Sequence, residues 1–538
     1  MKKLFTITIF SLILLLAACN KSETTSLRAY VNKNMEIKTT EVKFKVSYVD
    51  PDETLDNNNF TVKVYTKDDS FEQEVEIKKG REVTVTFDGL KSATEYTIDV
   101  LAKVDEKEVN LRITANKTFT TLIVGDIKED PILIETTEDF IDMQPKKHYR
   151  LANDIDFKGE SLTPLFSAGT PFTGSFDGDG HSIKNINLTE SKDVNKPYLS
   201  IFGYASKSII TNVTFDNIHI NNDENSYSGI HYVGLVVSKV SNNDFEMSNI
   251  TIKNSSLTIK HNVNKISTNR NLYVGLLGGS VQGKIYDIKI IDSELNVTQH
   301  GVNGSYAGTD ISTTGTYVGG ALGLVESDKG LGINQISVLD TTITVNINQD
   351  KLTKGSGSLY VGGVFGANRS DRKFRDIVAD TKIVINHTNF IDPKNEDEEE
   401  VEIDFDKLDL IYVGGIGSVI KPNTENLYYF GEIEVNLDTQ IKKVIVGLVT
   451  AQTNKSSIKV AASGSINIST DADEKTPVDY SIYNYRTNQK WDGFDDNVKL
   501  FNNPTVTVDG DLKELLGFEV IDSLDELIDS EFILNEIE

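Results

Sequence analysis

The chain has 538 residues, of which 54 are basic and 81 acidic, so its formal net charge is -27. A surface this acidic repels phosphate backbones, which excludes nucleic acid as an expected partner. Charged residues make up 25 % of the sequence and hydrophobic residues 38 %, and this balance predicts a folded chain rather than a disordered one. Length alone predicts roughly three or four compact domains, unless the chain is built from repeats.

Residues 1–19 have the pattern of a secretory signal. Two lysines precede an apolar run over residues 4–16, which is too short to span a bilayer. The run leads into the letters LAAC, in which Cys19 is the only cysteine of the chain. This ending resembles the lipobox of bacterial lipoproteins, and the resemblance implies cleavage before Cys19 and diacylglycerol on its thiol. An ordinary secretory signal with a chance cysteine is the alternative.

These features predict a protein that is anchored to a bacterial cell membrane by its lipid and exposed at the cell surface. No later apolar run reaches the length of a membrane span, so the lipid on Cys19 is the expected membrane anchor. Residues 20–38 begin with the polar letters NKSETTS and are expected to form a tether.

Residues 39–122 contain several short runs in which apolar and polar residues alternate. Such runs, separated by turn residues, predict a β-sandwich. The segment 90–96 (LKSATEY), with Tyr96 near the start of a strand, resembles the E–F corner of fibronectin type III domains. The usual tryptophan of strand B is missing, so another immunoglobulin-like sandwich is the alternative. We expect this domain to be a spacer, followed by a linker at residues 123–131.

A repeat fills most of the remaining chain. Its anchor is typically Tyr-Val-Gly, and the aligned glycines are Gly203, Gly234, Gly275, Gly319, Gly362, Gly414 and Gly447. Two further alternating runs follow each anchor, with small polar residues between them. Each period therefore supplies about three strands, which predicts one coil of a right-handed parallel β-helix rather than a four-stranded propeller blade. The expected fold class is all-β.

The anchors, together with residues 149–157 (YRLANDIDF) and 171–188, resemble the GLUG-type repeats of bacterial surface proteins. The resemblance implies a β-helix over residues 166–478. It implies no single function, because such repeats occur in adhesins, in surface enzymes and in proteins of unknown role.

The open ends of a solenoid must be covered. We expect an N-terminal cap at residues 132–165, with a short helix that starts near Thr137. Residues 479–538 are expected to hold the final strands and a helical cap at 523–537, whose apolar face contains Leu524, Leu527, Ile528 and Phe532.

The repeat periods differ in length, and the extra residues come after the third strand, at 260–271, 299–315, 348–358 and 387–409. Insertions at one coil position lie on one flank of a solenoid, often its binding face. This flank would bind an extracellular glycan or protein, with the candidate residues His261, Arg270, His300, Tyr306 and His387. Surface loops without a ligand are the alternative.

The longest insertion contains clustered carboxylates that could ligate calcium, among them Glu396, Asp397 and Glu398. The alternation and the glycine of an EF-hand loop are absent. A solvated acidic loop is therefore the favoured interpretation, and no metal or other cofactor is expected.

One compact group could carry acid–base chemistry, namely Asp177, Asp179 and His181 in the segment PFTGSFDGDGHSI. The two Asp-Gly steps equally fit a tight turn between strands, which is the interpretation we favour. No histidine is followed by glutamate, and neither a phosphate-binding loop nor a Gly-x-Ser-x-Gly elbow occurs. The sequence therefore favours a binding protein over an enzyme. A carbohydrate-active β-helix enzyme and a structural envelope component are the alternatives.

Overall fold

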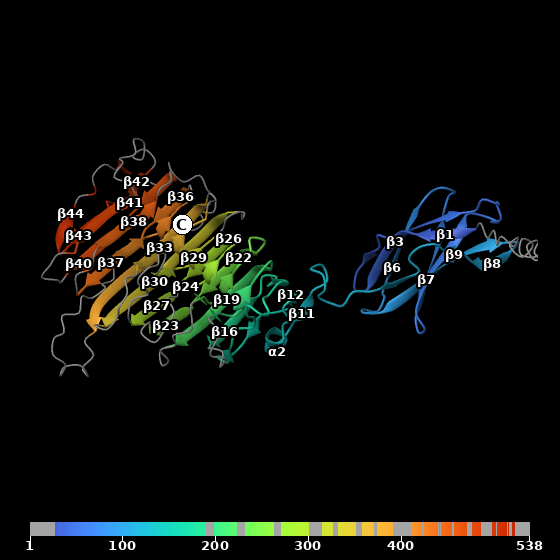
Figure 1. Cartoon of the computed structure of the whole chain (residues 1–538), viewed down its shortest axis with the longest axis horizontal. Helices are drawn as coiled ribbons and strands as arrows, with labels where there is room; N and C mark the ends of the chain where they lie inside the picture. Colours follow the sequence, from blue (N-terminus) through green and yellow to red (C-terminus); the bar gives the residue numbers. More distant parts are fainter. Residues whose placement is uncertain are drawn as a thin grey trace, which may run out of the picture. The chain divides into compact units, whose positions relative to one another are not determined.

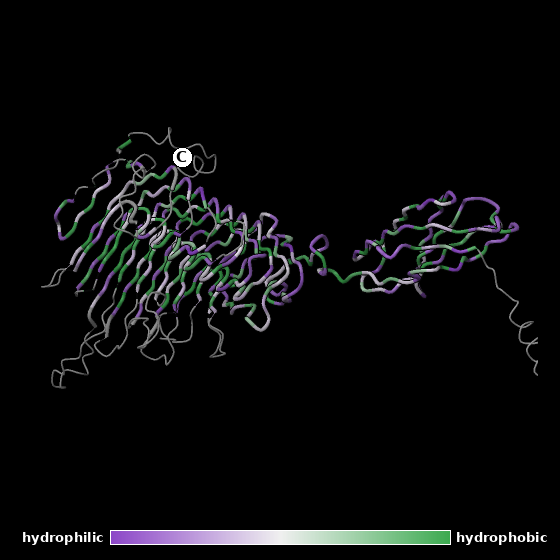
Figure 2. Tube along the Cα trace, turned by 45° about the horizontal axis from the view of Figure 1, so that its top comes forward, coloured by the Kyte–Doolittle hydropathy of each residue, from purple (hydrophilic) through white to green (hydrophobic). Residues whose placement is uncertain are grey.

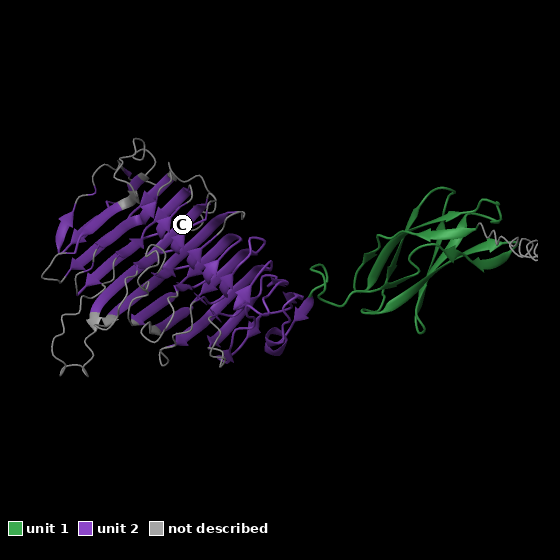
Figure 3. Ribbon diagram, viewed as in Figure 1, with its two compact units in different colours: residues 1–131 green, residues 132–538 purple. Residues whose placement is uncertain are grey.

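The computed structural model describes residues 27–521 except 190–197, 223–231, 263–270, 301–314, 327–331, 351–357, 371–373, 391–409, 422–423, 439–440, 442, 454–456, 471–475, 486–497, 502, 514 and 516–518. Cys19, the predicted signal peptide and the predicted helix at 523–537 lie outside the described residues. The chain divides into two compact units, Met1–Pro131 and Ile132–Glu538 (Figure 3). No helix in the described part of the chain is long and apolar enough to cross a membrane.

The first unit is a β-sandwich of two sheets. One sheet has the order β2-β3-β1-β9, with β6 also paired to β3, and the other has the order β10-β7-β4-β5, with β8 paired to β7. The strands are β1 (Arg28–Val31), β2 (Glu36–Ile37), β3 (Glu41–Val49), β4 (Asn59–Tyr65), β5 (Ser70–Glu76), β6 (Val83–Asp88), β7 (Glu95–Val104), β8 (Lys107–Asn110), β9 (Arg112–Ile113) and β10 (Thr118–Thr120).

The sandwich begins earlier than the sequence predicted. Strand β1 pairs with β3 and buries Ala29 and Val31, so residues from Arg28 onward belong to the sandwich and not to a tether. At the other end, the Tyr96 hydroxyl accepts a hydrogen bond from the Lys91 backbone nitrogen at 2.8 Å. This contact is the tyrosine corner that fixes the crossing between two strands in many sandwiches.

The second unit is a parallel β-helix, as predicted, and Figure 1 shows its strands in parallel rows. Its larger sheet contains β11 (Ile132–Ile134), β12 (His148–Leu151), β13 (Ile155–Asp156), β14 (Ser161–Leu162), β15 (Ser175–Asp177), β16 (Ser182–Leu188), β19 (Ile209–Asn222), β22 (Glu246–Lys253), β23 (Ser256–Asn262), β26 (Lys284–Ile291), β27 (Glu294–His300), β30 (Ile333–Asp350), β33 (Phe374–Phe390), β36 (Thr424–Tyr429), β37 (Glu432–Leu437), β39 (Ser457–Ala462), β40 (Ser465–Thr470), β42 (Val498–Phe501), β43 (Thr505–Val508), β44 (Asp511–Lys513) and β45 (Glu519–Ile521).

The smaller sheet contains the Tyr-Val-Gly strands and the strands that follow them after a sharp bend. They are β17 (Tyr198–Leu199), β18 (Tyr204–Ala205), β20 (Tyr232–Val233), β21 (Val237–Val240), β24 (Leu272–Gly275), β25 (Gly278–Val281), β28 (Gly315–Gly319), β29 (Leu322–Val325), β31 (Ser358–Gly362), β32 (Phe365–Asn368), β34 (Leu410–Gly414), β35 (Gly417–Ile420), β38 (Lys443–Thr453) and β41 (Val478–Tyr485). The bend brings strands close together. A Cβ atom on Gly319 would lie 2.1 Å from the Leu322 carbonyl oxygen, so only glycine fits there.

Successive coils pair in register, which places equivalent side chains in columns about 4.8 Å apart. One inward column runs through Ile288, Ile336, Ile377 and Leu427, all of which are fully buried. The alternation of hydrophobic and hydrophilic residues along these strands is visible in Figure 2. The inward apolar columns form one continuous core through the solenoid.

Polar residues form a column at one corner of the coil. Residues with positive φ occupy this corner in seven successive coils, namely Asn212, Asn249, Asp287, Gln335, Asp376, Asn426 and Lys459. Asparagine and aspartate tolerate this left-handed conformation better than most residues. Their side chains also connect the coils, since the Asn249 amide donates to the Asn212 carbonyl at 2.9 Å.

The solenoid begins earlier than residue 166. Strand β11 pairs in parallel with β12, and β12 pairs with β15, so coils are already present from Ile132. The short helix α2 (Thr137–Ile141) follows β11, with a capping box between Thr136 and Asp139. Its Phe140 is fully buried and makes edge-to-face contacts with two phenylalanine rings of the core. The helix therefore covers the apolar interior at this end.

Candidate ligand-binding groove

Asp177, Asp179 and His181 lie in a tight turn between β15 and β16. The His181 backbone nitrogen donates to the Gly178 carbonyl at 2.8 Å, and Asp179 and Gly180 both have positive φ, of 51° and 83°. These values are those of a type I′ turn, which explains the Asp-Gly letters.

The carboxylate of Asp177 is occupied by the fold. It accepts hydrogen bonds from the Asp179 backbone nitrogen and from the Asn212 side-chain amide, both at 3.0 Å. Its second oxygen lies 3.6 Å from Nε of Arg150. Through Asn212, Asp177 contacts the polar corner column, and its contacts give it a structural role in closing the turn.

His181 does not join Asp177. Its Nδ1 lies 3.5 Å from Oδ1 of Asp154, whose Oδ2 accepts a hydrogen bond from Lys184 at 2.6 Å. The Lys184 hydrogen bond, followed by that of the Ser182 backbone nitrogen, lowers the pKa of Asp154. The structure therefore does not assemble the predicted triad into one acid–base site.

The predicted insertion flank is only partly described. Arg270, Tyr306 and the carboxylates 396–398 lie outside the described residues. His261 is the last residue but one of β23, which ends at Asn262, and His300 is the last residue of β27. Asn262 and His300 are paired in register, so the two strands end at the same position along the coil.

His387 is buried, in contrast to the exposed position that we expected. Strand β33 continues to Phe390, so His387 lies inside the strand rather than in a loop, and its side chain is 0 % exposed. Burial lowers the pKa of His387 to about 4. A neutral imidazole in the core cannot serve an exposed binding flank.

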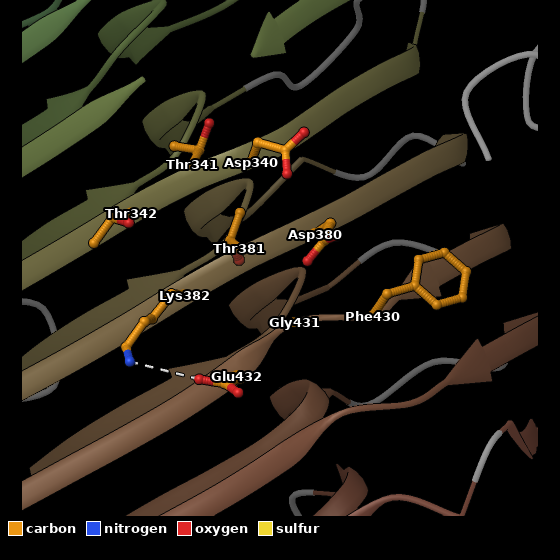
Figure 4. A pocket seen from close by; sticks show the side chains of 9 residues that line it. All are labelled: Asp340, Thr341, Thr342, Asp380, Thr381, Lys382, Phe430, Gly431 and Glu432. Carbon is orange, nitrogen blue, oxygen red and sulfur yellow. Dashed lines mark ion pairs between the residues drawn. The ribbon is translucent and has the colours of Figure 1, made fainter. Parts of the chain in front are cut away.

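A groove of about 330 Å³ opens at a different corner of the solenoid (Figure 4). Three consecutive residues from each of three successive coils line it, namely Asp340, Thr341 and Thr342, then Asp380, Thr381 and Lys382, then Phe430, Gly431 and Glu432. The register pairs Thr342 with Lys382 and Lys382 with Glu432, so the lining residues form a grid. We call this grid the acidic groove.

A change in coil length accompanies the acidic groove. Between β30 and β33 the register shifts after Val338, because Leu339 and Asp340 stand opposite the single residue Asp380. The next coil brings its backbone close, since a Cβ atom on Gly431 would lie 2.0 Å from the Thr381 carbonyl oxygen. Asp380 therefore lies beside the extra residue of the preceding coil and next to a close backbone approach by the following one.

The acidic groove has an uneven charge distribution. Burial raises the pKa of Asp380, and the negative charges of Asp340 and Glu432 raise it further. Lys382 lies 3.6 Å from Glu432 and partly balances that end of the groove. Within the described residues, the carboxylates of Asp340 and Asp380 have no hydrogen bond or ion pair, so they remain available to a ligand. The same part of the chain contains no group of three His, Cys, Asp or Glu side chains that could hold a metal ion.

A second repeated feature is a ladder of tyrosines on the outer face of the smaller sheet. The tyrosines of the anchor strands are paired in register and stack with ring centroids 4.6–5.7 Å apart, namely Tyr198, Tyr232, Tyr273, Tyr317, Tyr360 and Tyr412. Stacked rings cover one another's faces. The ladder therefore stabilises coil stacking and offers a ligand little aromatic surface.

The tyrosine hydroxyls also have partners within the fold. Arg369 donates to the Tyr317 hydroxyl at 2.6 Å, and Lys239 donates to that of Tyr232 at 2.9 Å. Burial raises the pKa of Tyr273 to about 12, which keeps its hydroxyl protonated at neutral pH. These contacts favour a structural role for the ladder and leave the acidic groove as the stronger candidate site.

No protein-family model matches the chain. Halomucin of Haloquadratum walsbyi (strain DSM 16790 / HBSQ001) is 31 % identical over 144 residues, which cover 24 % of this chain. The chain spans 2 % of the length of this curated relative.

Three solved structures are similar over most of their length. A candidate immunoglobulin A1 protease from Bacteroides ovatus has 14 % identity and a TM-score of 0.31, with 76 % of this chain and 89 % of that one covered. Pectate lyase Pel3 from Pectobacterium carotovorum has 11 % identity and a TM-score of 0.20, with 90 % and 99 % covered. The family 28 exopolygalacturonase of Yersinia enterocolitica has 11 % identity and a TM-score of 0.20, with 85 % and 99 % covered. Such scores carry no argument about function, and the β-helix follows from the strand pairing itself.

Sequence reasoning missed the acidic groove because its residues are about one coil apart in the chain. The sequence nevertheless contains a pattern that could have revealed the groove. The corner residues Asn254-Ser255, Asp292-Ser293, Asp340-Thr341 and Asp380-Thr381 repeat one pattern of an amide or acid followed by a hydroxyl. An alignment of coil corners would have placed Asp340 next to Asp380.

Proposed function

We propose that this protein is a lipid-anchored protein of a bacterial cell surface whose β-helix binds an extracellular glycan in the acidic groove. The lipobox-like letters before Cys19 support the anchor, and the polar sandwich surface suits a spacer. The resemblance of residues 90–96 to a fibronectin type III corner is supported by the Tyr96 hydrogen bond to Lys91. The repeat anchors, which resemble GLUG-type repeats, support a surface location.

One observation supports the choice of ligand. The acidic groove combines two carboxylates that have no partner among the described residues, Asp340 and Asp380, with a lysine, threonine hydroxyls and the half-buried ring of Phe430. Carboxylates accept hydrogen bonds from sugar hydroxyls, lysine donates them, and an aromatic ring packs against the apolar face of a sugar.

A glycan array tests this proposal. The mature chain with Cys19→Ser would be applied to the array, and hits would be measured by calorimetry. We expect Asp380→Asn and Glu432→Gln each to weaken binding about tenfold, because each removes a charge-assisted hydrogen bond. Glu294→Gln is the matched control, since Glu294 lies three coils away in the column of Glu432 and outside the groove. The proposal is contradicted if the chain binds no glycan, or if both groove variants bind glycan with the affinity of the wild type.

The anchor has its own test. Metabolic labelling with a fatty acid should mark the wild-type chain, and the label should disappear in Cys19→Ser together with membrane retention. Retained label in that variant would contradict lipidation at Cys19.

The raised pKa of Asp380 favours one second candidate function, that of a glycoside hydrolase. A carboxyl group whose pKa is raised by burial and by neighbouring negative charges has the property of a general acid. In this case bound glycans would be cleaved, and Asp380→Asn would abolish cleavage more strongly than binding. Product formation would be followed by chromatography over hours. If glycans bind and no product appears, binding is the function and hydrolysis is not.

A further inference from the structure

An apolar stripe runs along the outer face of the larger sheet near its C-terminal end. Its centre is Val378, Tyr428 and Ala461, which are paired in register on β33, β36 and β39. The half-buried side chains that pack against this centre are Leu339, Phe430, Phe501 and Ile521. We call these seven residues the outer stripe. They form a cluster separate from the solenoid core.

The centre of the outer stripe faces away from the core. Ile377 and Ala379 belong to the core cluster, and successive side chains of a strand point to opposite faces, so Val378 points outward. An outward side chain on a solenoid wall meets solvent unless another segment covers it. Val378 is nevertheless only 1 % exposed, and Tyr428 and Ala461 are 0 % exposed. The half-buried side chains of the outer stripe pack against them, and a segment lying over the sheet would complete their cover.

The chain itself supplies a segment at the right place. The described residues end at Ile521, which belongs to the outer stripe and is paired with Phe501. The next residues begin with Ser523, and Glu526 follows three positions later, which is the pattern of a helix-starting capping box. An apolar helical face then follows, formed by Leu524, Leu527, Ile528 and Phe532.

Length and charge also match. The outer stripe crosses the six strands β30, β33, β36, β39, β42 and β45, which span about 24 Å at the spacing of paired strands. Residues 523–537 as a helix would be about 22 Å long. Residues 522–538 carry seven carboxylates and no basic residue, and Arg375, Lys459 and Lys499 lie on the strands of the stripe. Opposite charges at the rim of an apolar contact favour one docking orientation.

We propose that residues 523–537 form an amphipathic helix that docks along the outer stripe, on the side wall of the solenoid rather than across its open end. The apolar face covers Val378, Tyr428 and Ala461; Glu531 lies on the same face, and the other carboxylates of the segment remain in water. Phe430 belongs to both the outer stripe and the acidic groove. The docked helix therefore packs beside one wall of the groove and fixes the orientation of that ring.

Hydrogen exchange on the mature chain with Cys19→Ser tests the docking. We expect the amides of residues 526–536 to exchange at least about 100-fold more slowly than those of a synthetic 522–538 peptide, because a docked helix must open before it exchanges. Leu527→Asp places a charge on the docking face and should return the segment to peptide rates. Ile533→Asp is the matched control, because Ile533 lies on the opposite side of the helix, and it should keep the protection.

Each outcome decides the proposal. Strand amides in β22 and β26 serve as an internal reference, and they should be unchanged in both variants because neither substitution is in the solenoid. Peptide-like exchange of residues 526–536 in the wild type, or equal losses in both variants, would overturn the docking. Protection that increases with protein concentration, with dimers seen by light scattering, would also overturn it and assign the outer stripe to a second copy of the chain.

Discussion

Two acidic corners of the same solenoid use their carboxylates in opposite ways. At the N-terminal corner, Asp177 is 20 % exposed and holds the Asp179 backbone nitrogen and the Asn212 amide. At the acidic groove, Asp340 and Asp380 have no such partners among the described residues. Acidic composition is therefore a weak guide to a binding site in this fold. The hydrogen bonds that a carboxylate already makes decide whether it can serve a ligand.

The path of the backbone explains the contrast. The N-terminal corner is a type I′ turn, whose exposed nitrogens and neighbouring corner amides need acceptors, and Asp177 supplies them. At the acidic groove, β33 continues through the corner, and the residues on either side of Asp380 pair with the neighbouring coils, while Asp380 itself falls at the register shift. The carboxylate of Asp380 therefore stabilises no turn or corner among the described residues.

The largest expected effect comes from glycines in the two corners. Gly431→Ala would place a Cβ atom 2.0 Å from the Thr381 carbonyl oxygen, whereas no atom lies within 4 Å of a Cβ on Gly180. We expect Gly431→Ala to lower the free energy of unfolding of the solenoid by about 2–4 kcal/mol, since backbone must move. Gly180→Ala should cost about 1 kcal/mol through its positive φ alone.

Urea titration followed by circular dichroism would measure both glycine variants, with the sandwich transition as a reference within the same chain. Equal losses in the two variants would show that coil spacing at Gly431 is more adaptable than its contacts indicate.

The second effect separates the two aspartates. Asp177→Ala removes the acceptor of two hydrogen bonds and leaves the Asn212 amide without this partner, so we expect a loss of about 1–3 kcal/mol in unfolding free energy. Asp380→Ala removes no such contact and should change stability by less than about 0.5 kcal/mol. Glycan affinity should show the reverse order. The same urea titration, paired with calorimetry on an array hit, checks both; a destabilised Asp380→Ala would contradict the comparison.

Much of the fold could be predicted from short stretches of the sequence. The Tyr-Val-Gly anchors define the coils because each glycine sits where backbones approach, and Asn or Asp recurs where φ is positive. The Asp-Gly steps around Asp179 define a turn for the same reason. These features depend on a few neighbouring residues, so one sequence reveals them.

The binding surface was harder to predict because it depends on register between coils. Whether His387 is in a loop or a strand depends on how far β33 extends, and β33 pairs with its neighbour β30 as far as Phe390. Asp340 and Asp380 become neighbours only through pairing across about 40 residues of sequence. The single-residue difference between their coils is invisible without that pairing. Long-range register, rather than side-chain chemistry, was the missing information.

The smallest expected effect is a pH dependence of opposite sign at the two corners. The Lys184 hydrogen bond lowers the pKa of Asp154 from its ordinary value of 3.8, so Asp154 stabilises the fold above that pH, and this contribution is lost as pH falls through the lowered pKa. Burial raises the pKa of Asp380 from 3.8, so its ionisation destabilises the fold as pH rises through the raised pKa. Both carboxylates contact solvent, so the effects should be small and weakened by salt.

Thermal unfolding at low salt, from pH 3 to pH 7, measures these signs. The midpoint of the wild type minus that of Asp154→Asn should increase with pH, whereas the midpoint of the wild type minus that of Asp380→Asn should decrease. Both trends should shrink when salt is added, because screening acts on exposed charges at either corner. If these two differences in unfolding midpoint changed with pH in the same direction, the acidic groove would stabilise the ionised form of Asp380, as the turn stabilises that of Asp154. Asp380 would then have a structural partner in solution, and the contrast between the corners would fail.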